Sequence, residues 1–189
     1  MAGASMKDIK LRIKSVESTM HITKAMELVA SSKLRKAKER QERCRPYFTG
    51  LKQTLESIET ATHDFSSPFQ QHREVKKRCL IVIAGDRGLA GGYNSNVFKS
   101  VLPLLRKGPV CVLPIGKRTV EFFARNDVEM LTTEFAEAAS VSVADCFTIS
   151  NLVTQGYLSG QYDEVSVVYT RFVSMLTQTP AQDSLLPLE

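Results

Sequence analysis

Residues 79–94 read CLIVIAGDRGLAGGYN, an apolar run followed directly by a glycine-rich segment. The first six residues, Cys79–Ala84, predict a short strand that is buried on both faces. Four glycines then fall within eight positions, which is typical of a tight turn between a strand and a helix. Such a turn can also hold a phosphate group, so this stretch bears on both the fold and the function.

The two best-known phosphate-binding patterns are absent from this stretch. The phosphate-loop pattern G-x-x-x-x-G-K-[ST] requires Ser or Thr after the Lys, whereas residues 116–118 read GKR. The dinucleotide pattern G-x-G-x-x-G also fails, because the four glycines of residues 85–92 are separated by 3, 3 and 1 positions. We therefore expect these glycines to allow a turn with positive φ. Anion binding by the backbone N–H groups of the loop is the alternative.

Expected strands and helices alternate from residue 78 onward. We expect strands over 79–84, 110–115, 128–132 and 164–172, and helices over 94–106, 117–125 and 142–158. Asn94 or Ser95 is the expected N-cap of the first of these helices. The alternation predicts an α/β fold, a small Rossmann-like domain with a mostly parallel sheet covered by helices.

A long helix is expected before this domain. Residues 6–60 contain a single glycine, Gly50, and a single proline, Pro46, which should bend or interrupt the helix. Apolar residues recur at intervals of three and four, as in a coiled-coil seam. The seam consists of Ile9, Ile13, Val16 and Met20. A helix with such a stripe needs a partner to cover it.

The net charge of +5 is distributed unevenly. Residues 1–45 carry twelve Lys or Arg against five Asp or Glu, so the remainder is slightly acidic. A solvated helix face would explain this, as would binding to an acidic protein, an anionic membrane or a nucleic acid. Residues 1–46 contain no Phe, Tyr or Trp, which disfavours the stacking of unpaired bases.

No catalytic or metal-binding pattern is present in the sequence. The four cysteines lie more than thirty residues apart and form no CxxC pair, so we expect reduced structural thiols, with Cys79 and Cys111 buried. G-x-S-x-G and H-E-x-x-H are both absent. No run approaches the ~20 apolar residues of a membrane span, and the first residues lack a signal-peptide core. We expect a cytoplasmic protein without catalytic residues, cofactor or metal.

Several blocks of the sequence resemble the γ subunit of F-type ATP synthases. They are MKDIKLRIKSVESTMHITKAMELVASSKLRKAKER, RPYF at 45–48, GDRGLAGGYN, and the segment around TQTPAQDSLLPLE. These blocks occur in the family's order and span nearly the whole chain. Many relatives have Cys where this chain has Ala90.

The resemblance implies a rotor in the central stalk of the synthase. Its partners would be the α and β subunits, ε and the c-ring, with peripheral attachment to the cytoplasmic face of the membrane through the complex only. Ion flow through the ring would turn the shaft and drive ATP synthesis at the β subunits, and the subunit would also regulate ATPase activity. No nucleic acid and no catalytic residue of its own are implied.

The resemblance also implies which residues contact the β subunits. Lys24, Met26, Lys33, Arg35 and Lys36 would do so from the long helix. A second group would lie on the glycine-rich loop. It comprises Asp86, Arg87, Leu89 and Ala90.

One departure from the family pattern concerns the last residues. The family's C-terminal helix is absent, so half of the expected shaft is not found in this sequence. We expect a long N-terminal coiled-coil helix over 1–60, a linker over 61–77, the Rossmann-like domain over 78–176, and the start of a connection over 177–189. The family's chloroplast dithiol insertion has no counterpart. The alternatives are a small α/β nucleotide-binding protein or enzyme, and a nucleic-acid-binding protein that uses the basic helix.

Overall fold

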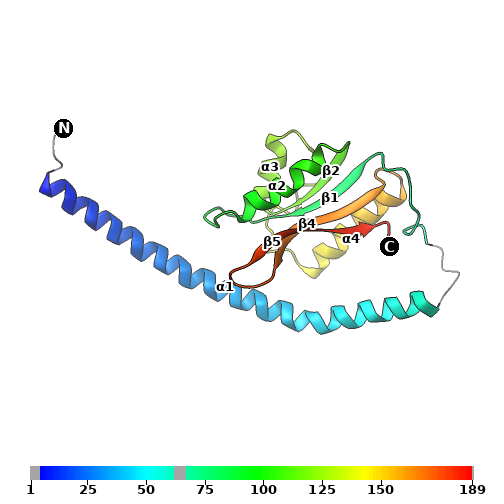
Figure 1. Cartoon of the computed structure of the whole chain (residues 1–189), viewed down its shortest axis with the longest axis horizontal. Helices are drawn as coiled ribbons and strands as arrows, with labels where there is room; N and C mark the ends of the chain where they lie inside the picture. The colour runs from blue at the N-terminus through cyan, green and yellow to red at the C-terminus, as the bar shows by residue number, and fades with distance from the viewer. Residues whose placement is uncertain (1–4, 62–66, 189) are drawn as a thin grey trace. The chain divides into compact units, whose positions relative to one another are not determined.

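The computed structural model describes residues 5–61 and 67–188. The chain divides into two compact units, residues 1–65 and residues 66–189. In the first unit the structure describes one long helix, and in the second it describes a sheet with helices (Figure 1).

Helix α1 (Met6–Ala61) has 56 residues. Ser5 and Asp8 satisfy its first turn, because Lys7 N donates to Ser5 Oγ and Ser5 N donates to Asp8 Oδ2, both at 3.3 Å. Pro46 was expected to bend or to interrupt the helix; the helix continues through Pro46, so the interruption does not occur, and Figure 1 shows an unbroken ribbon that curves along its length. A proline removes one hydrogen bond from a helix, and the long helical runs on both sides of Pro46 tolerate this loss.

Residues 67–188 contain a five-stranded sheet with the order β3-β2-β1-β4-β5. The strands are β1 (Arg78–Ile83), β2 (Val110–Ile115), β3 (Glu129–Met130), β4 (Glu164–Phe172) and β5 (Gln178–Leu186). The first four strands are parallel, and β5 is antiparallel to β4. The predicted α/β fold with a mostly parallel sheet is therefore confirmed.

Helices cover both faces of this sheet. Helices α2 (Tyr93–Leu105) and α3 (Lys117–Arg125) pack on one face. Helix α4 (Val143–Leu158) packs on the other. Strand β1 alternates between the two cores: Leu80 and Val82 face α2 and α3, whereas Cys79 and Ile81 face α4. Burial on both faces explains why the sequence of β1 is a continuous apolar run.

The start of α2 differs from the expectation. The N-cap is Gly92, and no side chain of the described residues caps the helix. Asn94, one of the two expected caps, binds the preceding loop instead, and Ser95 Oγ donates to Gly92 O at 3.0 Å. The tertiary contacts of Asn94 thus outweigh its preference for the cap position. In contrast, Ser142 caps α4 together with Asp145.

Two further differences concern the expected strands and core. Only residues 129–130 of the expected third strand pair with β2. Residues 177–189 were expected to form the start of a connection. Residues 178–186 instead form β5, the fifth strand of the sheet. Phe147 on α4 is exposed. Its position on α4 therefore lies outside the core.

Gly156 supports a tight contact between α4 and Tyr162. Tyr162 is buried, and its hydroxyl donates to Val153 O at 2.8 Å. A Cβ at position 156 would overlap this hydroxyl and would lie 2.8 Å from the ring atom Cε1. Substitution of Gly156 therefore forces either the helix or the buried ring to move.

We expect Gly156→Ala to lower the free energy of unfolding by about 1–3 kcal/mol, the usual cost of overpacking a core. Urea unfolding followed by the near-ultraviolet circular dichroism of the tyrosines measures the change. Gly50→Ala is the matched control, because a Cβ there meets open space in α1. The control should gain up to about 1 kcal/mol from helix propensity. Equal stability of Gly156→Ala and the unmodified chain would contradict the packing described.

Candidate functional site

The glycine-rich loop that follows β1 is held by side chains and backbone of the elements after it. Gly85 N donates to Asn94 Oδ1 at 2.8 Å, and Asn94 Nδ2 donates to Arg87 O at 3.0 Å. Arg118 N, at the start of α3, donates to Gly85 O at 3.1 Å. These polar groups are therefore occupied within the chain, which supports the prediction of a structural turn.

Asp86 joins three segments of the globular unit. Its Oδ1 accepts hydrogen bonds from Ala138 N at 2.7 Å and from Lys117 N at 3.4 Å. Its Oδ2 accepts a hydrogen bond from Ala139 N at 3.1 Å. Asp86 thus ties the loop after β1 to the start of α3 and to the segment before α4. The sequence suggested Asp86 only as an interface residue, and its bracing role was missed.

Gly116, the first residue of the Gly-Lys pair at 116–117, is the N-cap of α3. Its φ is 100°, and a Cβ there would overlap Ala84 O at the end of β1. Glycine is the residue that fits this close approach without strain. The pair therefore serves the packing of α3 against the end of β1.

The tip of the loop projects an apolar side chain. Leu89 has a φ of 60° and is 92% exposed. A positive φ is uncommon for a leucine, and such strain is often found at functional positions. Arg87 and Ala90 are also exposed. Three of the four loop residues expected to contact a partner therefore face solvent, whereas Asp86 is partly buried.

The turn between β4 and β5 carries a second apolar tip that sequence reasoning missed. Leu176 is 98% exposed, and Val173 and Met175 are also exposed. Leu176 and Ala90 line the same hollow of about 220 Å³, so the two tips lie next to each other. The signal in the sequence was the apolar cluster VSML (173–176) between two strands of mixed polarity.

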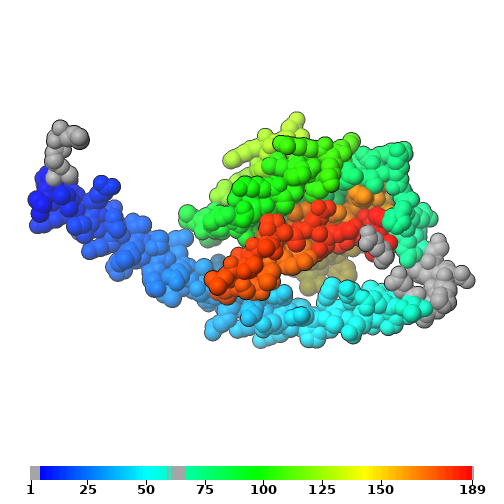
Figure 2. Space-filling view, viewed as in Figure 1, coloured from blue at the N-terminus to red at the C-terminus, as the bar shows by residue number. Residues whose placement is uncertain are grey.

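The basic residues of α1 are all exposed. In the space-filling view of Figure 2 the helix forms a thin rod. Lys24 pairs with Glu27 at 3.3 Å, and Arg35 contacts Glu39 at 3.9 Å. Such exposed pairs within a helix contribute little to stability. Met26, Lys33 and Lys36 are also exposed, as is every residue of the predicted seam. The seam consists of Ile9, Ile13, Val16 and Met20.

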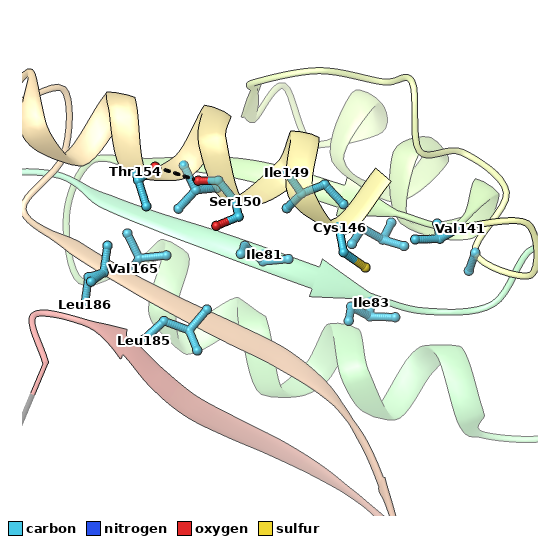
Figure 3. A pocket seen from close by; sticks show the side chains of 13 residues that line it. Ile81, Ile83, Val141, Cys146, Ile149, Ser150, Thr154, Val165, Leu185 and Leu186 are labelled. Atoms are coloured by element: carbon cyan, nitrogen blue, oxygen red, sulfur yellow. Dashed lines mark hydrogen bonds between the residues drawn. The ribbon is translucent and has the colours of Figure 1, made fainter. Parts of the chain in front are cut away.

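A separate apolar cavity of about 580 Å³ lies between α4 and the sheet (Figure 3). Ile81, Ile149 and Leu186 are among its walls. Its polar groups come mainly from Ser150 and Thr154, and Thr154 Oγ1 already donates to Ser150 O at 2.8 Å. No carboxylate, histidine, lysine or arginine is found among its described lining residues. The described lining residues therefore offer no group for acid–base chemistry.

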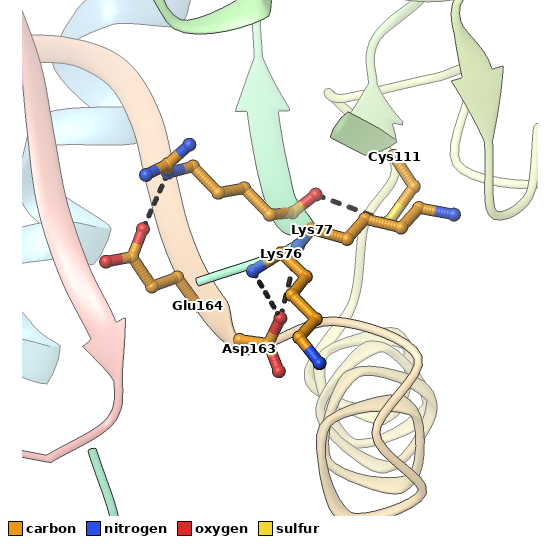
Figure 4. A network of polar contacts seen from close by, with 6 residues as sticks. Lys76, Lys77, Cys111, Asp163 and Glu164 are labelled. Carbon is orange, nitrogen blue, oxygen red and sulfur yellow. Dashed lines mark hydrogen bonds and ion pairs between the residues drawn. The ribbon is translucent and has the colours of Figure 1, made fainter. Parts of the chain in front are cut away.

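Polar contacts fix the start of β1, at the end opposite the glycine-rich loop (Figure 4). Asp163 Oδ2 accepts hydrogen bonds from Lys76 N at 2.8 Å and from Lys77 N at 3.1 Å. These two backbone donors lower the pKa of Asp163 below its ordinary value. Arg78 Nε contacts Glu164 Oε2 at 2.7 Å. The start of β1 is thereby attached to the start of β4.

The described residues, 5–61 and 67–188, contain neither a metal-binding cluster nor a membrane-spanning helix. No group of three or more His, Cys, Asp or Glu side chains gathers there as a metal site. No helix within these ranges is both long and apolar enough to cross a membrane.

A family model described as ATP synthase matches residues 5–189. The ATP synthase gamma chain of Ruminococcus albus is 44% identical over 191 residues, which cover 98% of this chain and 66% of the relative. The chain belongs to the ATP synthase gamma-chain family. The gamma chain of Alkaliphilus metalliredigens is 45% identical, covering 99% of this chain and 65% of its own length. The chain thus spans about two thirds of the curated gamma chains it matches.

A solved structure supports the same family. The central stalk and c-ring structure of the Tetrahymena thermophila mitochondrial ATP synthase contains a chain that is 25% identical, with a TM-score of 0.63. The match covers 88% of this chain and 72% of the other. The chain is therefore similar in fold to a chain found in an ATP synthase central stalk and c-ring structure.

We expect Asp86→Ala to destabilise this gamma-chain domain by about 1–3 kcal/mol, because it removes the acceptor of three backbone N–H groups, of which that of Ala138 is partly buried. Urea unfolding of the two variants Asp86→Ala and Arg87→Ala measures the difference. Arg87→Ala is the control, since Arg87 is the exposed neighbour on the same loop, and it should remain close to the unmodified chain. Similar losses in both variants would contradict the bracing role of Asp86.

Asp163 should make the domain sensitive to acid. The pKa of Asp163 in the folded state is lowered from 3.8, so its ionised form stabilises the fold. This contribution is present above about pH 4 and is lost as the pH falls through the folded pKa. We expect Asp163→Asn to show a shallower fall of the unfolding free energy below about pH 4 than the unmodified chain. Parallel curves of unfolding free energy against pH would contradict this assignment.

Proposed function

We propose that this chain is the rotor subunit in the central stalk of an F-type ATP synthase. In this role it couples rotation of the membrane c-ring, driven by ion flow, to ATP synthesis at the β subunits, and it regulates ATPase activity. The observation that carries the proposal is the 44% identity to a gamma chain over almost the whole of this chain. Catalysis would take place on the β subunits, and this chain would perform no bond chemistry.

The length of α1 suits a mechanical shaft. Its 56 residues at about 1.5 Å each reach roughly 84 Å. This length exceeds what the core of a small domain requires. Along the first turns the apolar seam is exposed, and a second helix would complete a coiled coil there. In the proposed role, α1 and this second helix would form a torque-bearing rod.

Charge suits the contact between this shaft and the β subunits. The basic residues Lys24, Lys33, Arg35 and Lys36 are exposed on α1, and they would face acidic groups on the β subunits. Exposed ion pairs contribute only about 0–1 kcal/mol each. Weak pairs can break and re-form as the shaft turns between equivalent subunits. The proposed interface therefore favours rotation over tight fixation.

The globular unit would lie near the β subunits, ε and the c-ring. Arg87, Leu89 and Ala90 would contact a β subunit from a loop that Asp86 and Asn94 hold in place. A rigid loop transmits force better than a mobile one. The chain would be a peripheral protein on the cytoplasmic face of the cell membrane, attached through the complex only. The proposal includes neither a cofactor nor a nucleic acid.

We expect the combined change Lys33→Gln, Arg35→Gln and Lys36→Gln to weaken binding to an assembled α and β subunit complex. Loss of three exposed charges should reduce the affinity about tenfold at low salt. The difference should shrink as added salt screens the charges. Sedimentation of the mixed complexes at a series of salt concentrations measures both effects.

The control is the combined change Lys52→Gln, Lys99→Gln and Lys107→Gln, which removes the same charge from exposed positions elsewhere. This control should bind like the unmodified chain. Equal weakening in both triple variants would show that only net charge matters. Stoichiometric binding of ATP by the isolated chain would favour a nucleotide-binding protein instead.

A further inference from the structure

Two cysteines that are far apart in the sequence are direct neighbours in the sheet. Cys79 on β1 and Cys111 on β2 are register partners in a parallel pair. Adjacent strands lie about 4.8 Å apart, and disulfides join Cα atoms about 4.4–6.8 Å apart. Both side chains belong to the core beneath α4, so they point to the same face. Both thiols are free and 0% exposed.

The surroundings distinguish the two sulfurs. In the protonated form the Cys111 thiol donates to Arg78 O at 3.6 Å (Figure 4). The pKa of Cys111 is lowered, first by a hydrogen bond with Cys79 and then by the nearby Lys77 ammonium, against the effect of burial. The same hydrogen bond, together with burial, raises the pKa of Cys79. We therefore assign Cys111, whose thiolate the Lys77 ammonium favours and which lies beside the short edge strand β3, as the sulfur that reacts first.

Cys111 lies next to a very short edge strand. Cys111 partners Glu129 on its other side, and β3 contains only Glu129 and Met130. Glu129 is also held by Lys77, with Nζ 2.7 Å from Oε2. A strand with two residues opens far more easily than the central strands. We expect opening of β3 to loosen the edge of β2 beside Cys111, and so to ease the entry of a small oxidant to the thiol beneath α4, while the rest of the sheet stays paired.

We propose that Cys79 and Cys111 form a peroxide-sensitive dithiol that closes a disulfide between β1 and β2. The Cys111 thiolate attacks hydrogen peroxide, which gives a sulfenic acid on Cys111 and releases hydroxide. The Cys79 thiol then attacks this sulfur, forms the S–S bond and releases water. Overall, two thiols are oxidised to one disulfide, and one hydrogen peroxide is reduced to two waters once the released hydroxide takes up a proton. An external thiol reverses the reaction by exchange.

The test uses the 189-residue chain with Cys44→Ser and Cys146→Ser, which removes the exposed thiols. After peroxide treatment we expect the intact mass to fall by two hydrogen atoms. Peptide mapping should join the segments that contain residues 79 and 111, and dithiothreitol should restore the original mass. An unchanged mass would overturn the proposal if an exposed thiol, such as Cys146 in the unmodified chain, is oxidised under the same conditions.

Two single substitutions in the same background test the order of the steps. With Cys79→Ser, the sulfenic acid on Cys111 has no resolving thiol, so dimedone should label Cys111. With Cys111→Ser, we expect at least tenfold less label on Cys79. Equal labelling of both variants would overturn the assigned nucleophile. Circular dichroism of each variant verifies that the sheet is folded.

Two matched variants test whether the oxidant reaches Cys111 through opening of β3. Glu129→Gln weakens the Lys77 ion pair on β3 and should speed disulfide formation about twofold to fivefold. Glu164→Gln weakens the comparable Arg78 ion pair on β4, at 2.7 Å, and should leave the rate unchanged. Equal acceleration in both variants would contradict opening at β3. This inference does not depend on the proposed rotor function, since it concerns only the chemistry of the sheet.

Discussion

The burial of β1 on all sides is the constraint on which the globular unit depends. Its two edges are occupied by β2 and β4, and its two faces are covered by α2 and α3 on one side and α4 on the other. No polar side chain could be placed in such a strand without losing its contact with water. The chain can therefore present polar groups only at the two ends of β1. The glycine-rich loop and the Asp163 network lie at those ends.

The parts of this fold that the sequence predicted are those with a strong local pattern. Strands over 110–115 and 164–172 and the helix over 117–125 occur as expected, because each has a clear apolar run or period. Strand β5 was missed because QTPAQDSLL contains a proline and polar residues. An antiparallel edge strand with one partner can keep such residues. Its identity as a strand depends on β4, which no local pattern reveals.

The candidate site was predicted less completely than the fold. The spacing of its glycines distinguishes the loop from the two nucleotide patterns, but it does not show that Asp86 joins three segments. The exposed tip at Leu176 and the pairing of Cys79 with Cys111 also depend on strand register. Sequence separation hides such neighbours. The roles of the α1 residues at a β subunit stay predictions, since they concern contacts outside this chain.

The position of β4 beside β1 has a consequence for synthesis on the ribosome. Arg78 pairs with Glu164, whereas its partner on the other side is Val110. Because the ribosome adds roughly 5–20 residues per second, β4 is synthesised several seconds after β2. The edge of β1 that pairs with β4 therefore stays unpaired longer than the edge that pairs with β2. During that interval one side of the most apolar strand is open to other chains. Late pairing across a long separation also slows folding. The nascent domain therefore passes through a period in which chaperone binding would protect it from aggregation.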